Sequence, residues 1–261
     1  MAELILKNVK MYVDGHDLTG DMNEVTLTEK VDILDKTVFG SNSRRRLAGL
    51  RDVEFSAGGF WNSSEGNEGT TSHKIDPVAF TRMGSSMSAV SILPNGTGLG
   101  DVSYTVPGCL SEYTPGGSIG DMFGYTITGY GINALARGKL VMRGIVSTNW
   151  GGANTSTGQN IGVATTQRKI ITGIHVLATS QAASGAKIGI KIQASTDSAF
   201  GGTPKTLYGT TLTTGLSGKS VYLTTKNPTT SYSYVRAKTS QNGTSTKRFK
   251  VILTVGHQKG R

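Results

Sequence analysis

The sequence is poor in several residue types, and each shortage excludes a class of protein. It contains one cysteine, Cys109, among 261 residues, which excludes an internal disulfide and a cluster of thiolate metal ligands. Cys109 is therefore expected to be a small buried or half-buried thiol. No apolar run approaches the roughly 18 residues of a membrane-spanning helix, so we expect no membrane span.

The usual catalytic patterns are also missing. The four histidines at positions 16, 73, 175 and 257 are scattered, and no G-x-S-x-G, H-E-x-x-H, P-loop or C-x-x-C motif is present. The glycine-rich stretch 96–100 imitates a phosphate-binding loop but lacks the strand and helix that should flank it. We expect turn glycines there, and we expect no catalytic residue, no cofactor and no enzymatic activity.

One acidic cluster remains as a candidate metal site, formed by Asp14, Asp17, Asp21 and Glu24. Its spacing does not match a calcium-binding EF-hand loop, which needs acids at positions 1, 3 and 5 and a glutamate at position 12. A solvated turn is favoured over a calcium site, and no metal ligand is expected.

Acidic residues are almost absent from the second half of the chain. Residues 1–155 hold 13 basic and 16 acidic residues, a net charge of −3, whereas residues 156–261 hold 14 basic residues and one acid, Asp197, a net charge of +13. The excess positive charge of the chain therefore belongs to its second half, where it would favour a polyanion or an acidic neighbouring surface.

Short alternating segments dominate what is present, and helical periodicity is scarce. Asp14-Gly15 is a hairpin-type turn, Pro94–Gly96 and Tyr113–Gly117 are expected turns, and only residues 76–80 suggest a short helix. Expected strands cover residues 4–13, 23–30, 52–61, 87–93, 101–106, 121–130, 138–146, 169–178, 186–194, 206–212, 219–223, 232–238 and 248–255.

A stretch rich in Gly, Ser and Thr coincides with the change in charge. We expect a first β domain over residues 1–150, a linker over 151–160 and a basic β-sandwich over 161–261. Within the second unit, Ile188, Ile190 and Ile192 should face the core, with Lys191 on the opposite face.

Three arginines, Arg44, Arg45 and Arg46, stand in a loop-like stretch followed by Leu47 and Leu50. They could bridge to acidic groups of a neighbouring subunit or grip phosphate, or they could be a solvated loop. We retain them with Leu47, Leu50, Phe60 and Trp61 as candidates for contacts between subunits.

About fifty residues, from Met11 to Trp61, resemble the opening of siphophage major tail (tail tube) proteins. The resemblance rests on three motifs: a turn of the type D/N-G-x-D-L-S/T-G, a segment L/V-D-x-T-x-F-G followed by a basic loop, and a strand ending in G-F-W/Y. Their residues here are Asp14, Gly15, Asp17, Leu18, Thr19 and Gly20, then Leu34, Asp35, Thr37, Phe39 and Gly40, then Arg44–Arg46, Gly49 and Leu50, and finally Gly59, Phe60 and Trp61. Residues 191–208 are similar to a segment of β domains appended to such proteins.

The resemblance implies a tail-tube-like β-sandwich with one short helix and a long loop. The strand spacing predicts a second antiparallel β-sandwich after it, of Ig-like or jelly-roll-like type, so the chain is expected to be mainly β. The resemblance further implies a virion protein whose subunits close into hexameric rings, which stack into the DNA conduit of a long-tailed phage beside other tail proteins. DNA would pass through the lumen without sequence-specific binding. The resemblance leaves open whether the basic half is tube wall, exterior decoration or a contact to the anionic surface of the host.

Two alternatives to a tube subunit stay open. A capsid decoration or cement protein could use the basic half to clamp an acidic shell, and a carbohydrate-binding surface module could be built on the second sandwich. The N-terminus MAELILKNVK does not resemble a signal peptide, and the two tryptophans are few for stacking on sugars. We expect synthesis and assembly in the host cytoplasm and a final location in the virion tail.

Overall fold

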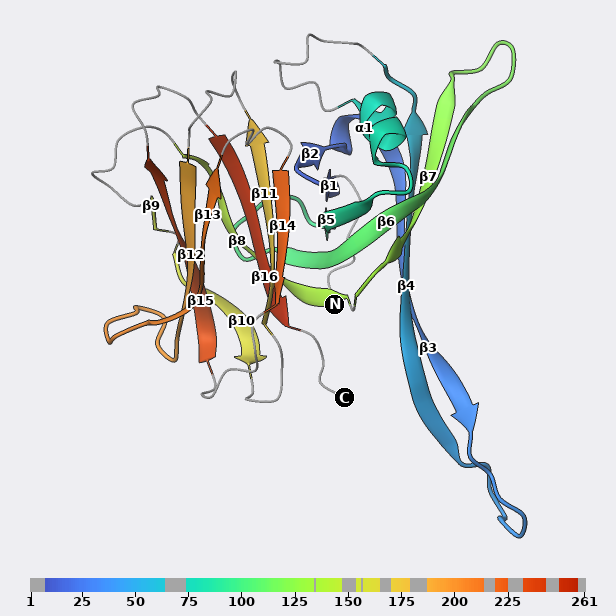
Figure 1. The fold of residues 1–261 in the computed structure, drawn as a ribbon, viewed down its shortest axis with the longest axis horizontal. Helices are drawn as coiled ribbons and strands as arrows, with labels where there is room; N and C mark the ends of the chain where they lie inside the picture. Colours follow the sequence, from blue (N-terminus) through green and yellow to red (C-terminus); the bar gives the residue numbers. More distant parts are fainter. Residues whose placement is uncertain are drawn as a thin grey trace.

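Alternating apolar and polar residues build this chain almost entirely from antiparallel strands (Figure 1). The computed structural model describes residues 8–63, 74–133, 135–146, 154–155, 157–164, 170–178, 187–213, 219–224, 232–242 and 249–257. The elements are β1 (Lys10–Val13), β2 (His16–Asp17), the 3₁₀ turn η1 (Thr19–Asp21), β3 (Met22–Asp35), β4 (Arg46–Phe60), α1 (Ile75–Arg82), β5 (Ser86–Leu93), β6 (Val102–Gly116), β7 (Gly124–Gly131), β8 (Ala136–Val146), β9 (Asn154–Thr155), β10 (Gln159–Ala164), β11 (Ile170–Ala178), β12 (Lys187–Ser195), β13 (Lys205–Thr213), β14 (Lys219–Thr224), β15 (Tyr232–Asn242) and β16 (Phe249–His257).

These strands form two sheets. The larger has eleven strands and runs β14-β11-β16-β8-β6-β5-β1-β2, with β7, β4 and β3 continuing from β6 as a branch. The smaller has five strands, in the order β10-β15-β12-β13 with β9 beside β15. β6 pairs with β5 along one edge, and along its other edge it pairs first with β8 and then with β7. The large sheet therefore branches at β6, curls and joins both halves of the chain (Figure 1). The expectation of a mainly β chain with antiparallel sheets is confirmed.

The first core lies inside the curl of the large sheet, under α1 (Figure 1). Its centre is Phe55, which is fully buried. The Phe55 ring lies over Gly108 and Gly129, where a Cβ would approach the ring to 2.8 and 2.2 Å. Neither position therefore has room for a side chain, which explains two glycines inside strands.

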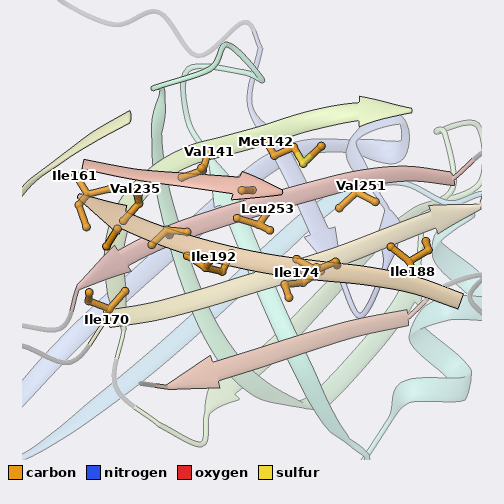
Figure 2. Packing of buried hydrophobic residues seen from close by; sticks show 14 of the residues in the cluster. Val141, Met142, Ile161, Ile170, Ile174, Ile188, Ile192, Val235, Val251 and Leu253 are labelled. Carbon is orange, nitrogen blue, oxygen red and sulfur yellow. The ribbon is translucent and has the colours of Figure 1, made fainter. Parts of the chain in front are cut away.

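The second core lies between the small sheet and strands β8, β11 and β16 of the large one (Figure 2). Ile188, Ile190 and Ile192 are fully buried there and Lys191 is exposed, as their alternation predicts. Burying each isoleucine removes apolar surface from water and contributes on the order of 1.5–3 kcal/mol. Because β8 belongs to residues 136–146, this sandwich is completed by a strand from the first half of the sequence.

Strands β11 and β16 are buried on both faces, because their second face packs on β1, β5 and β6. A small apolar cluster joins the halves there, made of Tyr12, Leu93, Leu140, Leu177 and Ile252. Thr105 on β6 and Thr254 on β16 share a hydrogen bond of 2.8 Å between their hydroxyl oxygens. The two cores are thus held together by a buried layer that is partly polar.

Of three local predictions, two are confirmed and one is wrong. The two-residue turn at Asp14-Gly15 is confirmed, with positive φ at both residues (46° and 85°) as a type I′ hairpin requires, and the short helix is confirmed as α1. The turn expected at Tyr113–Gly117 is wrong, because Tyr113 to Gly116 pair with β7 and the chain reverses after them. Tertiary pairing there overrides a Pro-Gly turn signal.

The stretch expected to be a linker contributes two strands. Asn154–Thr155 form β9 and Gln159 begins β10, and both strands pair with β15. The remaining residues of 151–156 lie outside the described residues, as do Leu4 and Leu6 of the first expected strand. Whether residues 1–150 and 161–261 fold as separate domains stays a prediction.

Candidate assembly surfaces

The most unusual surface of the molecule is the far part of the β3–β4 hairpin, residues 29–52, here called the arm. It extends away from both cores (Figure 1), and its strands pair with each other in antiparallel register, with one shift between Val31 and Ile33. Its apolar residues remain exposed: Val31, Ile33, Leu34, Val38, Phe39, Leu47 and Leu50 have exposed fractions from 39% to 108%. Scattered exposed apolar residues are ordinary, whereas clusters of exposed apolar residues are typical of interaction surfaces.

The tip of the arm is held in shape by local hydrogen bonds. The Asp35 carboxylate accepts hydrogen bonds from the backbone N–H of Thr37 (2.8 Å) and from its hydroxyl. The Thr37 hydroxyl oxygen accepts from the backbone N–H of Arg45 at 3.0 Å, and Gly40 takes a φ of +84°. These bonds lower the pKa of the Asp35 carboxyl, because they favour its charged form. The pattern D-x-T-x-F-G therefore builds a preformed turn that presents Phe39 fully to solvent.

The basic and apolar candidates follow this tip. Arg44 and Arg45 are exposed in the turn, and Arg46 begins β4 opposite Asp35. Leu47 lies opposite Leu34 in the register and Leu50 is 68% exposed. Residues 46–50, expected to be loop, are strand, since pairing with β3 extends β4 by six residues beyond the alternating run at 52–61.

Phe60 and Trp61 lie at the other end of β4, so the seven candidates do not form one patch. Phe60 is 46% exposed, whereas Trp61 is half-buried against the first core. The Trp61 indole N–H donates to an Asp76 carboxylate oxygen at 3.2 Å, and its ring meets Phe123 edge-on at 5.4 Å. The Trp61 side chain is thus held by contacts within its own chain, whereas the Phe60 side chain is exposed and can contact another protein.

A second exposed apolar cluster, which the sequence reasoning missed, surrounds Phe60. The turn between β6 and β7 carries Ile119 (108% exposed), Met122 (71%) and Phe123 (48%). This turn lies at the opposite end of the long β3-β4-β7-β6 layer from the arm tip (Figure 1). The sequence does show apolar residues near Gly117 and Gly120. Because the turn is expected at Tyr113–Gly117, Met122 and Phe123 fall in the strand expected over 121–130 and not in an exposed turn.

The other residues that carry the tail tube resemblance shape the backbone. The Asp17 carboxylate accepts from the Thr19 N–H at 3.2 Å, Leu18 is buried, and the Thr19 hydroxyl oxygen accepts from the Met11 N–H at 3.2 Å. A Cβ on Gly59 would come within 1.9 Å of the Asp21 carbonyl oxygen. These residues fix the entry into β3 and its close approach to β4, without forming a binding site.

One buried pair has the composition of a catalytic site. The His175 Nε2 lies 2.9 Å from the Ser91 hydroxyl oxygen, but both residues have no exposed surface. The His175 Nδ1 accepts from the backbone N–H of Gly15 at 3.3 Å, so the proton stands on Nε2 and is donated to Ser91. No substrate can reach this serine, and the pair belongs to the packing between the halves.

From Ser91 the hydrogen bonds continue in one direction. Its hydroxyl lies 3.0 Å from the Thr105 hydroxyl, which contacts the Thr254 hydroxyl, which in turn donates to the Gly173 carbonyl oxygen at 3.3 Å. Each hydroxyl can donate once in this chain, so the buried groups are satisfied. Burial lowers the pKa of His175 to about 3, with a smaller contribution from His16.

The acidic cluster of the sequence is dispersed. Asp14 accepts from the Ser220 hydroxyl at 2.6 Å and pairs with Arg82 at 2.9 Å, while Asp21 accepts from the Ile75 N–H at 3.2 Å. Glu24 is exposed. Within the described ranges no three His, Cys, Asp or Glu side chains are placed to hold a metal ion.

Two smaller expectations concern Cys109 and the glycine-rich stretch. Cys109 is half-buried, as expected. Gly96 and Gly100 have positive φ, and Asp101 accepts from the Gly98 N–H at 2.7 Å, so the stretch is a turn. In the part of the chain that the structure describes, no helix has the length and hydropathy to cross a membrane.

Comparisons with known proteins gave structural matches alone. No family model and no curated protein sequence matches the chain. A chain of the virion of a native gene transfer agent particle is 15% identical, with a TM-score of 0.40, and the match covers 52% of this chain and 98% of that one. A chain of the tail of an empty gene transfer agent particle gives 15% identity and a TM-score of 0.37 over 49% of this chain and 92% of that one. The sheath/tube terminator of an extracellular contractile injection system gives 11% identity and a TM-score of 0.41, over 52% of this chain and 97% of that one.

Proposed function

We propose that this chain is a structural virion protein, the tail tube subunit of a long-tailed phage, and that it has no enzymatic role. Copies assemble into hexameric rings, and the rings stack into the conduit through which DNA passes. Assembly takes place in the host cytoplasm, and the finished protein is located in the tail beside other tail proteins.

The observation that carries the proposal is the exposed apolar arm. Seven apolar side chains of residues 31–50 lie in solvent in the isolated subunit, although a preformed turn holds their tip in place. Covering such a surface with a partner would stabilise the complex by on the order of 25 cal/mol for each Å² of apolar surface buried. The arm is therefore built to be covered by another protein surface.

The second apolar cluster supports contact between copies of the chain. Phe39 at one end and Ile119 at the other end of the same layer are different surfaces on one subunit. Contacts between two different surfaces are heterologous, and repeated heterologous contacts generate rings or open filaments. A tube of stacked rings needs contacts that close each ring and contacts that join one ring to the next. A subunit with two separate apolar ends offers a surface for each kind of contact.

Charge supports a conduit that does not hold DNA. The first half of the chain carries a net charge of −3, and the arm exposes Asp32 and Asp52 beside its arginines. A near-neutral to acidic lumen wall would not bind phosphate strongly. Arg44, Arg45 and Arg46 then serve contacts to acidic groups of a neighbouring subunit, together with Leu47, Leu50 and Phe60.

Electron microscopy of the purified protein in negative stain tests the proposal. Wild-type protein should form six-fold rings or hollow tubes, and Phe39→Ser should leave monomers with an unchanged melting temperature. Leu99→Ser is the matched control, because Leu99 is 49% exposed in a distant turn and its loss should leave rings intact. Monomers or trimers in the wild type that bind only to capsid shells would contradict the tube and support a decoration protein.

The decoration protein is the second candidate, favoured by one observation. The net charge of +13 on residues 156–261 would complement an acidic shell. It accounts less well for the arm, since a clamp on a charged surface needs no exposed apolar hairpin.

A further inference from the structure

The outer surface of the small sheet carries cations that the proposed tube does not use. Along β12 and β15 the inward residues are buried in the second core, whereas Lys191, Gln193, Arg236 and Lys238 occupy the outward positions between them. These four residues, here called the basic face, lie on two neighbouring hydrogen-bonded strands. They form one compact block, because outward neighbours on a strand are about 6.8 Å apart and adjacent strands about 4.8 Å.

The charges in this block are unfavourably placed for folding alone. Lys191 lies directly opposite Lys238, and Gln193 opposite Arg236. Like charges directly opposite each other destabilise a sheet. The one acid of the second half, Asp197, is committed to the backbone N–H groups of Ala199 (3.1 Å) and Gly201 (3.4 Å). None of the ion pairs found among the described residues involves the second half.

The block is also held in position. The Arg236 guanidinium lies 4.3 Å from the centre of the Phe200 ring, and its Nε donates to the Gln193 side-chain oxygen at 3.0 Å. Lys191 lies beside Gly209 on β13, where a Cβ would stand 3.6 Å from its Cγ. A cation fixed by an aromatic ring next to two lysines is preorganised for an anion that spans several positions.

The face lacks the features that other partners require. Protein interfaces need apolar anchors at their centre, yet every large apolar side chain found exposed in the described residues belongs to residues 31–132. Single-stranded nucleic acid needs several aromatic stacking positions, and the outward positions beside the basic face offer one half-buried tyrosine, Tyr234. Sequence-specific readout of duplex DNA needs an element that enters a groove, which the middle of a sheet cannot do.

We propose that the basic face binds a flexible, non-nucleic phosphodiester polymer of the kind exposed on bacterial cell surfaces. Successive phosphates contact Lys191, Lys238 and Arg236, and the linking polyol units need no pocket. Since lysine is a flexible point charge, binding depends on the charge density of the polymer more than on the order or stereochemistry of its units. The basic half thereby gives the particle a weak, salt-sensitive attachment to the cell envelope.

The test measures binding of the full-length soluble protein to immobilised poly(glycerol phosphate) at low and at about physiological salt. Lys191→Gln and Lys238→Gln should each weaken binding about fivefold, as expected for one lysine near an anionic surface. The double variant Lys191→Gln/Lys238→Gln should bind more weakly than either single variant. The control double variant Lys30→Gln/Lys36→Gln removes the same two charges from the exposed arm and should bind like the wild type. Equal weakening by both double variants would overturn the assignment to this face, as would absence of binding at low salt.

A charge reversal separates a binding role from a structural one. Lys238→Glu places a carboxylate opposite Lys191, so binding should fall further than in Lys238→Gln while the melting temperature stays equal or rises. A melting temperature that falls together with binding would contradict the proposal. Tighter binding of polyglutamate would point instead to an acidic protein surface, and tighter binding of single-stranded or duplex DNA to a nucleic acid; either result overturns the proposed partner. None of these outcomes depends on whether rings form.

Discussion

The two halves of this molecule place their apolar residues and their charges in opposite ways. The first half leaves Phe39 and Ile119 fully exposed at its two ends. The second half, where the structure describes it, buries or half-buries its large apolar residues and presents Lys191 and Lys238 outward. The difference teaches that the exposed apolar ends of the first half are suited to contact with another protein surface. The second sandwich closes its core only with β8 from the first half, and its outer surface is suited to a charged partner.

Removing residues 156–261 is expected to have the largest effect. The truncation takes β16 and β11 away from β8, β1 and β5 and exposes Tyr12, Leu93 and Leu140 to water. The remaining chain should lose its cooperative thermal transition, measured by circular dichroism, and bind a hydrophobic dye. A truncated chain that melts cooperatively and still forms rings would show that the halves are separable domains.

A pair of phenylalanine substitutions contrasts the core of the first half with its arm. Phe55→Ala removes a fully buried ring and should lower the free energy of unfolding by about 3–5 kcal/mol. Phe39→Ala, with the same change in volume at an exposed site, should alter it by less than about 0.5 kcal/mol. Urea unfolding of both variants, measured at a concentration too low for assembly, gives the comparison. Similar losses would mean that the arm folds back onto the subunit.

The buried layer between the halves predicts a dependence of stability on pH. The pKa of His175 is about 3 in the folded protein and near 6.5 when unfolded, so between these values the unfolded state binds a proton that the folded state does not. Stability should therefore fall as the pH decreases from about 6.5 towards 3, by up to about 1.4 kcal/mol per pH unit from this residue. The other titratable residues beside His175 are His16 and Tyr12.

His175→Gln isolates this contribution. A glutamine can accept from the Gly15 N–H and donate to Ser91 without titrating, so the variant should unfold with a pH slope reduced by one proton. Unfolding measured in urea at several pH values between 4 and 7 gives both slopes. An unchanged slope would show that His175 is not the group that titrates on unfolding.

The smallest expected effect concerns the arm tip. Thr37→Val removes the hydroxyl that accepts from the Arg45 N–H, at a site exposed to solvent. The melting temperature should stay within about 1 °C of the wild type, while the Arg45 amide exchanges its hydrogen faster, as measured by NMR. Thr28→Val, near the base of the same strand, is the control. Unchanged exchange at Arg45 would show that the tip does not depend on this bond.

Much of the fold follows from local pattern, and the failures have physical causes. The strand around Ile188–Ile192 was predictable because one of its faces is buried and alternation reports it. The run Val251–Val255 was predictable as a strand because it is apolar and rich in β-branched residues, although its second face, with Ile252 and Thr254, is buried as well. The extension of β4 to Arg46 was not, because exposed strand residues on the arm carry no alternation. The β6–β7 turn was misplaced because Pro115 and Gly116 can pair at a strand end as well as form a turn.

The candidate surfaces show the same limit. Arg44–Arg46, Leu47 and Leu50 could be selected from sequence because a basic loop beside apolar residues is unusual, but nothing local separates Phe60 from Trp61. Their different exposure depends on Asp76 and Phe123, which are distant in the chain. The cluster at Ile119 becomes recognisable as a surface only when β6 and β7 are paired.

By itself the sequence determined that this is a β protein with a basic second half and no catalytic motif, because alternation, charge and missing residue types are local properties. It also determined the turn at Asp14-Gly15, because both residues tolerate positive φ, and the turn at Asp35–Gly40, where the Asp35 side chain bonds to the nearby backbone of Thr37. Only the tertiary structure decided that β8 completes the second sandwich, that His175 is buried and neutral, and that Lys191 opposes Lys238. Each of these depends on which strands become neighbours, and long-range pairing is a property of the whole chain.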